Sequence, residues 1–148
     1  MAPDFTLTTY KKLIETLHNA AYTFQVFKNF QNKADEKFVV LRHDVDKLPE
    51  NALRMAQLEN DLGIRASYYF RAIPNVFNKE IITKIADLGH EIGYHYEDLS
   101  LAKGDTNKAI KQFEQNLAAF RELYPVSTIC MHGSPLSPID NRDIWNTY

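Results

Sequence analysis

The chain has 148 residues, which is enough for one domain around one hydrophobic core. Its 45% apolar and 24% charged residues are ordinary for a folded protein and exclude a disordered chain. A formal net charge of −2 argues against a nucleic-acid-binding protein, and no apolar run approaches the ~20 residues that span a bilayer. Residues 1–5 lack the features of a secretory signal. We therefore expect a cytoplasmic protein, one domain over residues 1–148, that binds neither nucleic acid nor membrane.

Hydrophobic spacing predicts helices and strands that alternate along the chain. Apolar residues recur at helical spacing over 6–19, and a second helical stretch over 23–32 completes a predicted helical lead-in at 1–34. The elements predicted beyond the lead-in are strands at 38–43, 66–71, 91–95 and 126–131, and helices from Pro49 to a C-cap at Gly63, at 77–88 and at 105–123.

This alternation is typical of a parallel sheet built from βαβ units, and thus of an α/β fold. A complete eight-stranded β/α barrel needs ~250 residues, whereas this sequence predicts four strands. The chain is therefore either a small open α/β fold or part of a barrel, and we expect it to be the N-terminal part of a longer barrel. A barrel interrupted in this way has an open sheet edge, through which we expect self-association.

Polar side chains follow each of the four predicted strands. In parallel α/β folds, ligands bind at the carboxyl ends of the strands, so these side chains are candidates for one site. Asp44 and Asp46 are two residues apart and therefore point to the same face of a strand. Two carboxylates so close together need a cation nearby, and His95 could add a nitrogen ligand. The pattern predicts a divalent metal, with zinc first and manganese, iron or cobalt as alternatives.

The same residues also have ordinary structural interpretations. Asp44 and Asp46 could cap the following helix, or pair with Arg42 or Lys47. His90 is expected to be a hydrogen-bonded structural residue at the start of its strand. Cys130, the only cysteine, excludes an internal disulfide and is expected to be a small buried residue on the fourth strand.

Three stretches of the sequence resemble one known family. They are Leu-Arg-His-Asp-Val-Asp at 41–46, Ala-Ser-Tyr-Tyr-Phe at 66–70 and Gly-His-Glu-Ile-Gly-Tyr-His at 89–95. Together they resemble the polysaccharide deacetylase family, also called the NodB-homology group or carbohydrate esterase family 4. The resemblance covers residues 38–138. It implies a distorted, usually seven-stranded β/α barrel, incomplete in this chain, that uses a zinc-type metal to remove acyl groups from amino sugars.

The resemblance also implies roles for individual residues. Asp44 corresponds to the catalytic base and Asp46 to a metal ligand, although Val45 separates them here. His95 matches the first histidine of a metal-binding pair spaced four apart, but the second position is Leu99. The remaining metal ligand is therefore left open between Glu97, which has the strand parity of His95, and His132. His132 also stands roughly where the family places an arginine beside the base, so it is a candidate catalytic residue.

The predicted function is hydrolysis of a non-peptide carbon–nitrogen bond, most specifically metal-assisted N-deacetylation of an amino sugar or polysaccharide. Arg71 or a backbone N–H is the candidate oxyanion donor. Tyr69, Tyr94 and Tyr96 are predicted to bind the small-molecule or saccharide substrate. The alternative is a catalytically degenerate carbohydrate-binding or interaction module of the same fold, which the leucine at position 99 favours.

Overall fold

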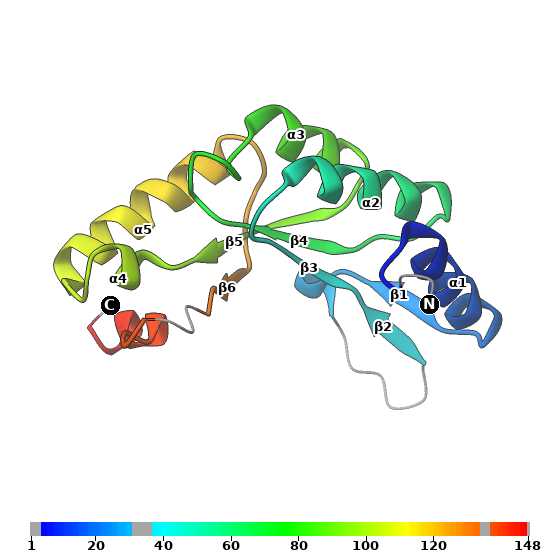
Figure 1. Cartoon of the computed structure of the whole chain (residues 1–148), viewed down its shortest axis with the longest axis horizontal. Coiled ribbons are helices and arrows are strands. Elements are labelled where there is room, and N and C mark those ends of the chain that lie inside the picture. Colours follow the sequence, from blue (N-terminus) through cyan, green and yellow to red (C-terminus); the bar gives the residue numbers. More distant parts are fainter. Residues whose placement is uncertain (1–3, 31–36, 134–136, 148) are drawn as a thin grey trace.

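The computed structural model describes residues 4–30, 37–133 and 137–147. Helices and strands alternate over most of this range, as Figure 1 shows. In chain order the elements are α1 (Leu7–Asn19), β1 (Thr23–Gln25), the 3₁₀ helix η1 (Phe27–Asn29), β2 (Phe38–Val40), β3 (Arg42–Val45), α2 (Pro49–Asp61), β4 (Ser67–Phe70), α3 (Lys79–Asp87), β5 (Glu91–Tyr96), α4 (Asp98–Leu101), α5 (Thr106–Arg121), β6 (Ile129–Met131) and the 3₁₀ helix η2 (Asn141–Asn146).

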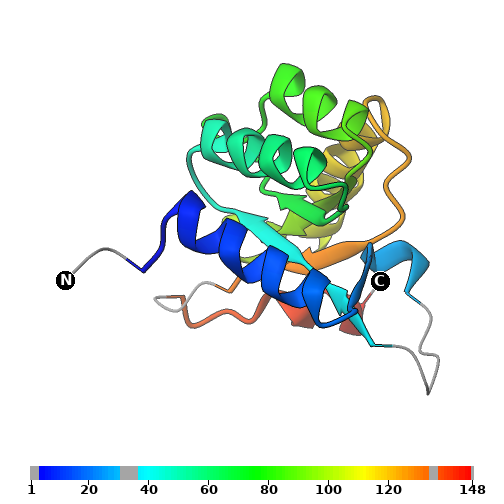
Figure 2. The same ribbon diagram turned by 90° about the vertical axis from the view of Figure 1, so that its right-hand side faces the viewer.

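The central element is a four-stranded sheet in the order β3-β4-β5-β6, in which every neighbouring pair is parallel. The sheet curls strongly, so that it forms about half of a barrel (Figure 1). Helices α2 and α3 pack side by side on its convex face, as both views show (Figures 1 and 2). The α/β class and the parallel strands predicted from the sequence are confirmed. A seven-stranded barrel is not: four strands form the main sheet within the described ranges.

Strand register divides the sheet into two chemically different faces. Asp44 is level with Tyr69, and Tyr69 is level with Gly93, so these residues share the concave face with His95 and its partner in register, Cys130. The alternate strand residues, which include Tyr68, Phe70, Ile92 and Tyr94, point toward the helices. They form the core together with helix residues such as Phe113 and Phe120 of α5. Asp44 of β3 and His95 of β5 therefore line the concave face.

Gly93 is required by close packing on that concave face. A Cβ atom at position 93 would lie 2.4 Å from the ring of Tyr69, far inside van der Waals contact. The Tyr69 ring in turn lies 5.7 Å from the guanidinium carbon of Arg42. The missing side chain of Gly93 thus lets Tyr69 lie across the sheet and support Arg42.

The helical lead-in predicted over 1–34 is wrong beyond α1. Residues 23–25 form strand β1, which pairs in parallel with β2, and Phe27–Asn29 is a 3₁₀ turn. The backbone N–H groups of Phe27 and Lys28 donate to Ser67 and Glu91 in the main sheet. These contacts join segments 40 or more residues apart, so local spacing of apolar residues carries no sign of them. Residues 1–3 and 31–34 of the predicted lead-in lie outside the described residues.

Other element boundaries also shift. The single strand predicted at 38–43 is two strands, β2 and β3, because Leu41 separates segments that belong to different sheets. The strand predicted at 126–131 is shortened to β6, and the short helix α4 was not predicted. Helices α2, α3 and α5 follow the predictions closely, with Pro49 in the first turn of α2 and Gly63 just beyond its C-cap at φ +73°. Within the described part of the chain, no helix is long and apolar enough to cross a membrane.

A buried carboxylate attaches α1 to the half-barrel. Glu59 of α2 is fully buried and accepts hydrogen bonds from the Tyr10 hydroxyl at 2.5 Å, from His43 Nε2 at 2.7 Å and from the Tyr68 hydroxyl at 2.6 Å. Burial raises the pKa of Glu59, but the hydrogen bonds to its charged form outweigh burial and hold the pKa below its ordinary value. The ionised carboxylate therefore stabilises the contact between α1, α2 and the sheet.

Replacing Glu59 with glutamine is expected to lower stability by about 1–3 kcal/mol at neutral pH, because a buried network loses its charged acceptor. The lowered pKa means that the stability supplied by ionised Glu59 is present above its unfolded-state pKa and is lost as the pH falls through its folded-state pKa. Glu59→Gln should therefore flatten the acid side of a stability–pH curve measured by urea unfolding. The control is Glu15→Gln, an exposed carboxylate on α1. An unchanged acid slope in Glu59→Gln would contradict this account.

Candidate metal centre

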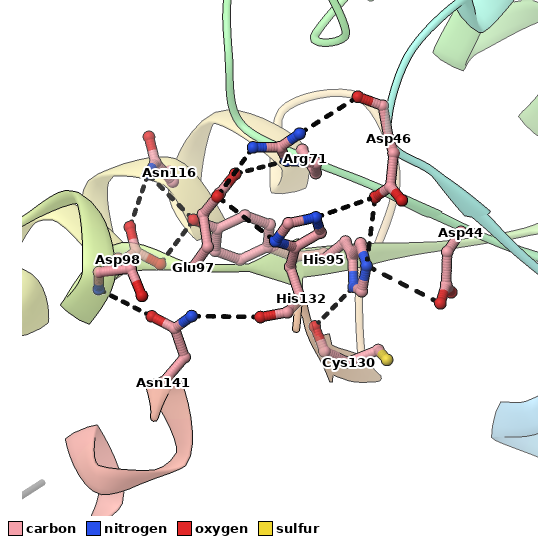
Figure 3. Close-up of polar contacts among 12 residues, drawn as sticks. Asp44, Asp46, Arg71, His95, Glu97, Asp98, Asn116, Cys130, His132 and Asn141 are labelled. Atoms are coloured by element: carbon pink, nitrogen blue, oxygen red, sulfur yellow. Dashed lines mark hydrogen bonds and ion pairs between the residues drawn. The ribbon is translucent and has the colours of Figure 1, made fainter. Parts of the chain in front are cut away.

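Asp46, His95 and His132 converge at the carboxyl end of the sheet (Figure 3). Asp46 Oδ1 lies 3.5 Å from His95 Nε2 and 3.4 Å from His132 Nε2. Potential ligand atoms of the three residues all lie within 4.8 Å of one another. One carboxylate and two imidazoles form a donor set that binds zinc and other divalent transition metals. The loop after β3, strand β5 and the loop after β6 supply one residue each.

The hydrogen bonding of His95 leaves one ring nitrogen for a metal. His95 Nδ1 lies 3.1 Å from the carbonyl oxygen of Cys130, and a carbonyl can only accept, so Nδ1 carries the proton. Burial lowers the pKa of His95, which favours the neutral ring. The Nε2 lone pair of neutral His95 then faces carboxylate oxygens of Asp46 and Asp44, at 3.5 and 3.8 Å. A lone pair facing carboxylates is repulsive unless a cation lies between them.

Asp46 provides independent support for a cation. Its Oδ1 atom is buried and has no hydrogen-bond partner among the described residues. A buried carboxylate oxygen without a donor is costly, and a metal ion is one of the few groups that compensate this cost. The residues present therefore fit a divalent metal. Of the two ligands left open by the sequence, His132 is the one grouped with Asp46 and His95, its ligand atom lying within 4.8 Å of theirs.

Asp44 lies beside these three residues but is held by a different partner. The Arg42 guanidinium donates from Nε to Asp44 Oδ1 at 2.8 Å and from Nη2 to Oδ2 at 2.5 Å. Burial raises the pKa of Asp44, but the hydrogen bonds from Arg42 and the nearby histidines outweigh it, so the pKa is lowered. The predicted pairing with Arg42 is confirmed. Helix capping is wrong, because Leu48 is the N-cap of α2 and no side chain caps it.

Glu97 and Arg71 support the site instead of taking the roles predicted for them. Arg71 donates from Nε to Glu97 Oε1 at 2.5 Å and from Nη2 to Oε2 at 2.8 Å, so its guanidinium is occupied by a carboxylate and not aimed at a substrate oxygen. Glu97 Oε2 lies 3.4 Å from Nδ1 of His132, on the side of the ring opposite Asp46. A carboxylate behind a histidine is the usual way to orient a metal-binding imidazole.

The three tyrosines predicted to bind substrate are buried. Tyr69, Tyr94 and Tyr96 have exposed fractions of 2%, 1% and 4%. Tyr94 and Tyr96 alternate with His95 along β5, so they point to the helix side, where the Tyr94 hydroxyl donates to Asp98. The Tyr69 hydroxyl donates to Thr128. Tyr94 and Tyr96 are core residues, and the alternation of a strand already separates them from His95, whereas Tyr69 is buried on the concave face.

Cys130 and Asn141 belong to the surroundings of the site but were not among the predicted site residues. Ligand atoms of Cys130, Asp44 and His95 lie within 4.8 Å of one another, and burial raises the pKa of the Cys130 thiol. Its position follows from strand register, because Cys130 is level with His95. Asn141 is buried in η2, donates to the carbonyl of His132 at 3.1 Å and accepts from the Ser100 N–H at 2.8 Å. No local sequence signal indicates this bridge.

A cavity that could hold a ligand lies beside His132 of the centre. A cavity of about 340 Å³ is lined by His132, its neighbours Met131 and Gly133, and residues 137–141. A larger cavity of about 580 Å³ lies between α1 and α2 and includes none of the metal-site residues. The smaller cavity is therefore the one relevant to chemistry at this centre.

Removing the charge of Glu97 is expected to weaken metal binding at the centre. Glu97→Gln should lower the affinity for Zn²⁺ about 10–100-fold in a calorimetric titration, because His132 loses the carboxylate behind its ring. The control is Glu122→Gln, which removes an exposed carboxylate paired with Lys79 on the helical surface. Equal affinities in the two variants would show that Glu97 does not orient His132.

Comparisons with protein-family models, with curated proteins and with solved structures find no match to this chain. The likeness to polysaccharide deacetylases accordingly rests on the sequence motifs.

Proposed function

We propose that the chain is a divalent-metal-assisted hydrolase of carbon–nitrogen bonds, and that it removes an acyl group from the nitrogen of an amino sugar. The observation that carries the proposal is the convergence of Asp46, His95 and His132 beside the ionised carboxylate of Asp44. Three donors and a neighbouring base are the parts that hydrolytic metal sites have in common. The resemblance of residues 41–46 and 89–95 to deacetylase motifs supplies the substrate class.

Each residue of the centre has a definite part in this chemistry. Asp46, His95 and His132 would hold the metal, which when bound polarises an acyl oxygen and lowers the pKa of water. Asp44 accepts the proton of the attacking water, and its lowered pKa keeps it ionised at neutral pH. Arg42 fixes the orientation of Asp44 through two hydrogen bonds. Glu97 and Arg71 form the ion pair behind His132.

A second candidate function is binding without catalysis. It is favoured by the Arg42–Asp44 pair, because both oxygens of the proposed base already accept hydrogen bonds from a guanidinium. It is also favoured by Leu99, which is buried in the core at the position where the family has a second histidine. A carbohydrate-binding module of the same fold would keep the cavity beside His132 and lack turnover.

Acetate release separates the two functions. The purified chain, stripped of metal with a chelator and then loaded with Zn²⁺, Mn²⁺ or Co²⁺, is incubated with N-acetylglucosamine oligosaccharides. We expect acetate release that depends on added metal and is lost on renewed chelation. Saccharide binding without acetate release under any of the three metals would overturn the hydrolase and favour the binding module.

A further inference from the structure

The sheet brings a second set of metal ligands together next to the first. Asp44, His95 and Cys130 also place their ligand atoms within 4.8 Å of one another. Asp44 and Cys130 belong to the two edge strands, β3 and β6, and His95 lies on β5 between them. The curl of the sheet brings these strands' side chains together over its concave face. This set shares only His95 with the set formed by Asp46, His95 and His132.

His95 can serve only one of these sets at a time. Its side chain is 3% exposed, and its Nδ1–H is committed to the Cys130 carbonyl, so Nε2 is the nitrogen that remains for a metal. One nitrogen lone pair coordinates one ion. Figure 3 shows Asp44 and Cys130 on one side of the His95 ring and His132 on the other. The two sets are therefore alternative positions for a single ion, which binds His95 either with Asp44 and Cys130 or with Asp46 and His132.

The two sets differ in the kind of ion that they favour. Asp46, His95 and His132 offer oxygen and nitrogen, which suit many divalent transition metals. Asp44, His95 and Cys130 offer oxygen, nitrogen and sulfur, and a thiolate favours soft ions. We propose that Asp44, His95 and Cys130 form a second metal position, selective for strongly thiophilic divalent ions such as Cd²⁺. On binding, the Cys130 thiol releases its proton to solvent and a metal–sulfur bond forms.

An ion in this second position would inhibit hydrolysis, a consequence that rests on the proposed function. Asp44 is the proposed base, and a carboxylate that coordinates an ion cannot accept a proton from water. The ion would also withdraw His95 from the position beside Asp46 and His132. Thiophilic ions would therefore switch the centre off, whereas harder ions such as Mn²⁺ would occupy the hydrolytic position and leave Asp44 available.

Ultraviolet absorption tests the position directly, because a thiolate bound to Cd²⁺ gives a charge-transfer band and the chain has one cysteine. Titration of the metal-free full chain with Cd²⁺ should give this band at one ion per chain. Cys130→Ser should abolish the band, and Asp44→Asn should weaken Cd²⁺ binding measured by the band at least ~10-fold, because a charged ligand becomes a neutral amide. The matched controls are Asp46→Asn and His132→Ala, which leave Asp44, His95 and Cys130 intact and should retain the band.

The proposal is overturned if Asp44→Asn binds Cd²⁺ as tightly as the parent chain, or if His132→Ala loses the band as fully as Cys130→Ser. Alkylation of Cys130 by iodoacetamide gives a readout that needs no variant. Cd²⁺ should slow alkylation of the parent chain at least ~10-fold, and an unchanged rate would overturn the proposal.

Inhibition measurements separate this inference from the proposed function. In a chain that releases acetate with Mn²⁺, Cd²⁺ should inhibit in parallel with the absorption band, and Cys130→Ser should need at least ~10-fold more Cd²⁺, relative to its own uninhibited rate. A band with the expected variant pattern in a chain without turnover leaves the second position standing and removes the hydrolase. Turnover without the band supports the hydrolase and overturns the second metal position.

Discussion

Replacing Asp46 with alanine is expected to lower the affinity of the hydrolytic position for Mn²⁺ more than ~100-fold. Loss of a group that hydrogen-bonds to a metal ligand typically lowers metal affinity ~10–100-fold, and loss of the ligand itself lowers it more. Asp46 Oδ1 lies between the two histidines, within 3.5 Å of a ring nitrogen of each, so no other carboxylate oxygen replaces it there. Calorimetric titration with Mn²⁺ measures the effect and avoids the thiophilic ions that favour Cys130.

The control for this experiment is Asp61→Ala, which removes an exposed carboxylate at the end of α2. Without metal, Asp46→Ala should be no less stable than Asp61→Ala, because the side chain it removes has a buried oxygen without a hydrogen-bond donor. Retention of parent-like Mn²⁺ affinity by Asp46→Ala would exclude the triad of Asp46, His95 and His132 as the metal position.

Replacing Asp44 with asparagine is expected to reduce the rate of acetate release by ~10²–10⁴-fold, the usual contribution of a general base. Asparagine has the shape of aspartate and can still accept from Arg42, but its amide oxygen cannot take the proton of water at neutral pH. The affinity for Mn²⁺ should remain within a fewfold of the parent value, because Asp44 is not part of the hydrolytic triad.

The two measurements on Asp44→Asn belong together. Loss of the rate with Mn²⁺ retained assigns Asp44 to proton transfer. Loss of the rate together with Mn²⁺ would show instead that Asp44 is a ligand of the hydrolytic position. A parent-like rate would remove Asp44 from the mechanism, and the Arg42–Asp44 pair would then be structural.

The sequence predicts the repetitive part of the fold well because each βαβ unit carries its own signals. Pro49 and Gly63 bracket α2, and the strand predicted at 66–71 forms as the fully buried β4 over Ser67–Phe70. The prediction of a helical lead-in over residues 1–34 fails for the opposite reason. Thr23–Gln25 becomes a strand only by pairing with β2, and Phe27 is positioned by Ser67, so the deciding contacts are remote in sequence.

The site follows a similar division. Asp46, His95 and His132 were predictable because parallel strands deliver their carboxyl ends to one edge, whatever the details of packing. The roles of Arg71 and Glu97 were not, since both residue types suit several functions and only the fold shows that they pair with each other. Tyr94 and Tyr96 were assigned against the alternation of their own strand, a signal that was present in the sequence.

The bridge made by Asn141 connects the centre with the most C-terminal described segment. Its amide joins η2 to the His132 carbonyl and to the Ser100 N–H of α4, so opening of η2 breaks one hydrogen bond to His132 and one to α4. Local opening and ion binding are then thermodynamically linked, because an ion that binds only the closed state raises the free energy of opening. Residues 137–147 should accordingly exchange their amide hydrogens more slowly when the centre is loaded, although none of them is a proposed ligand.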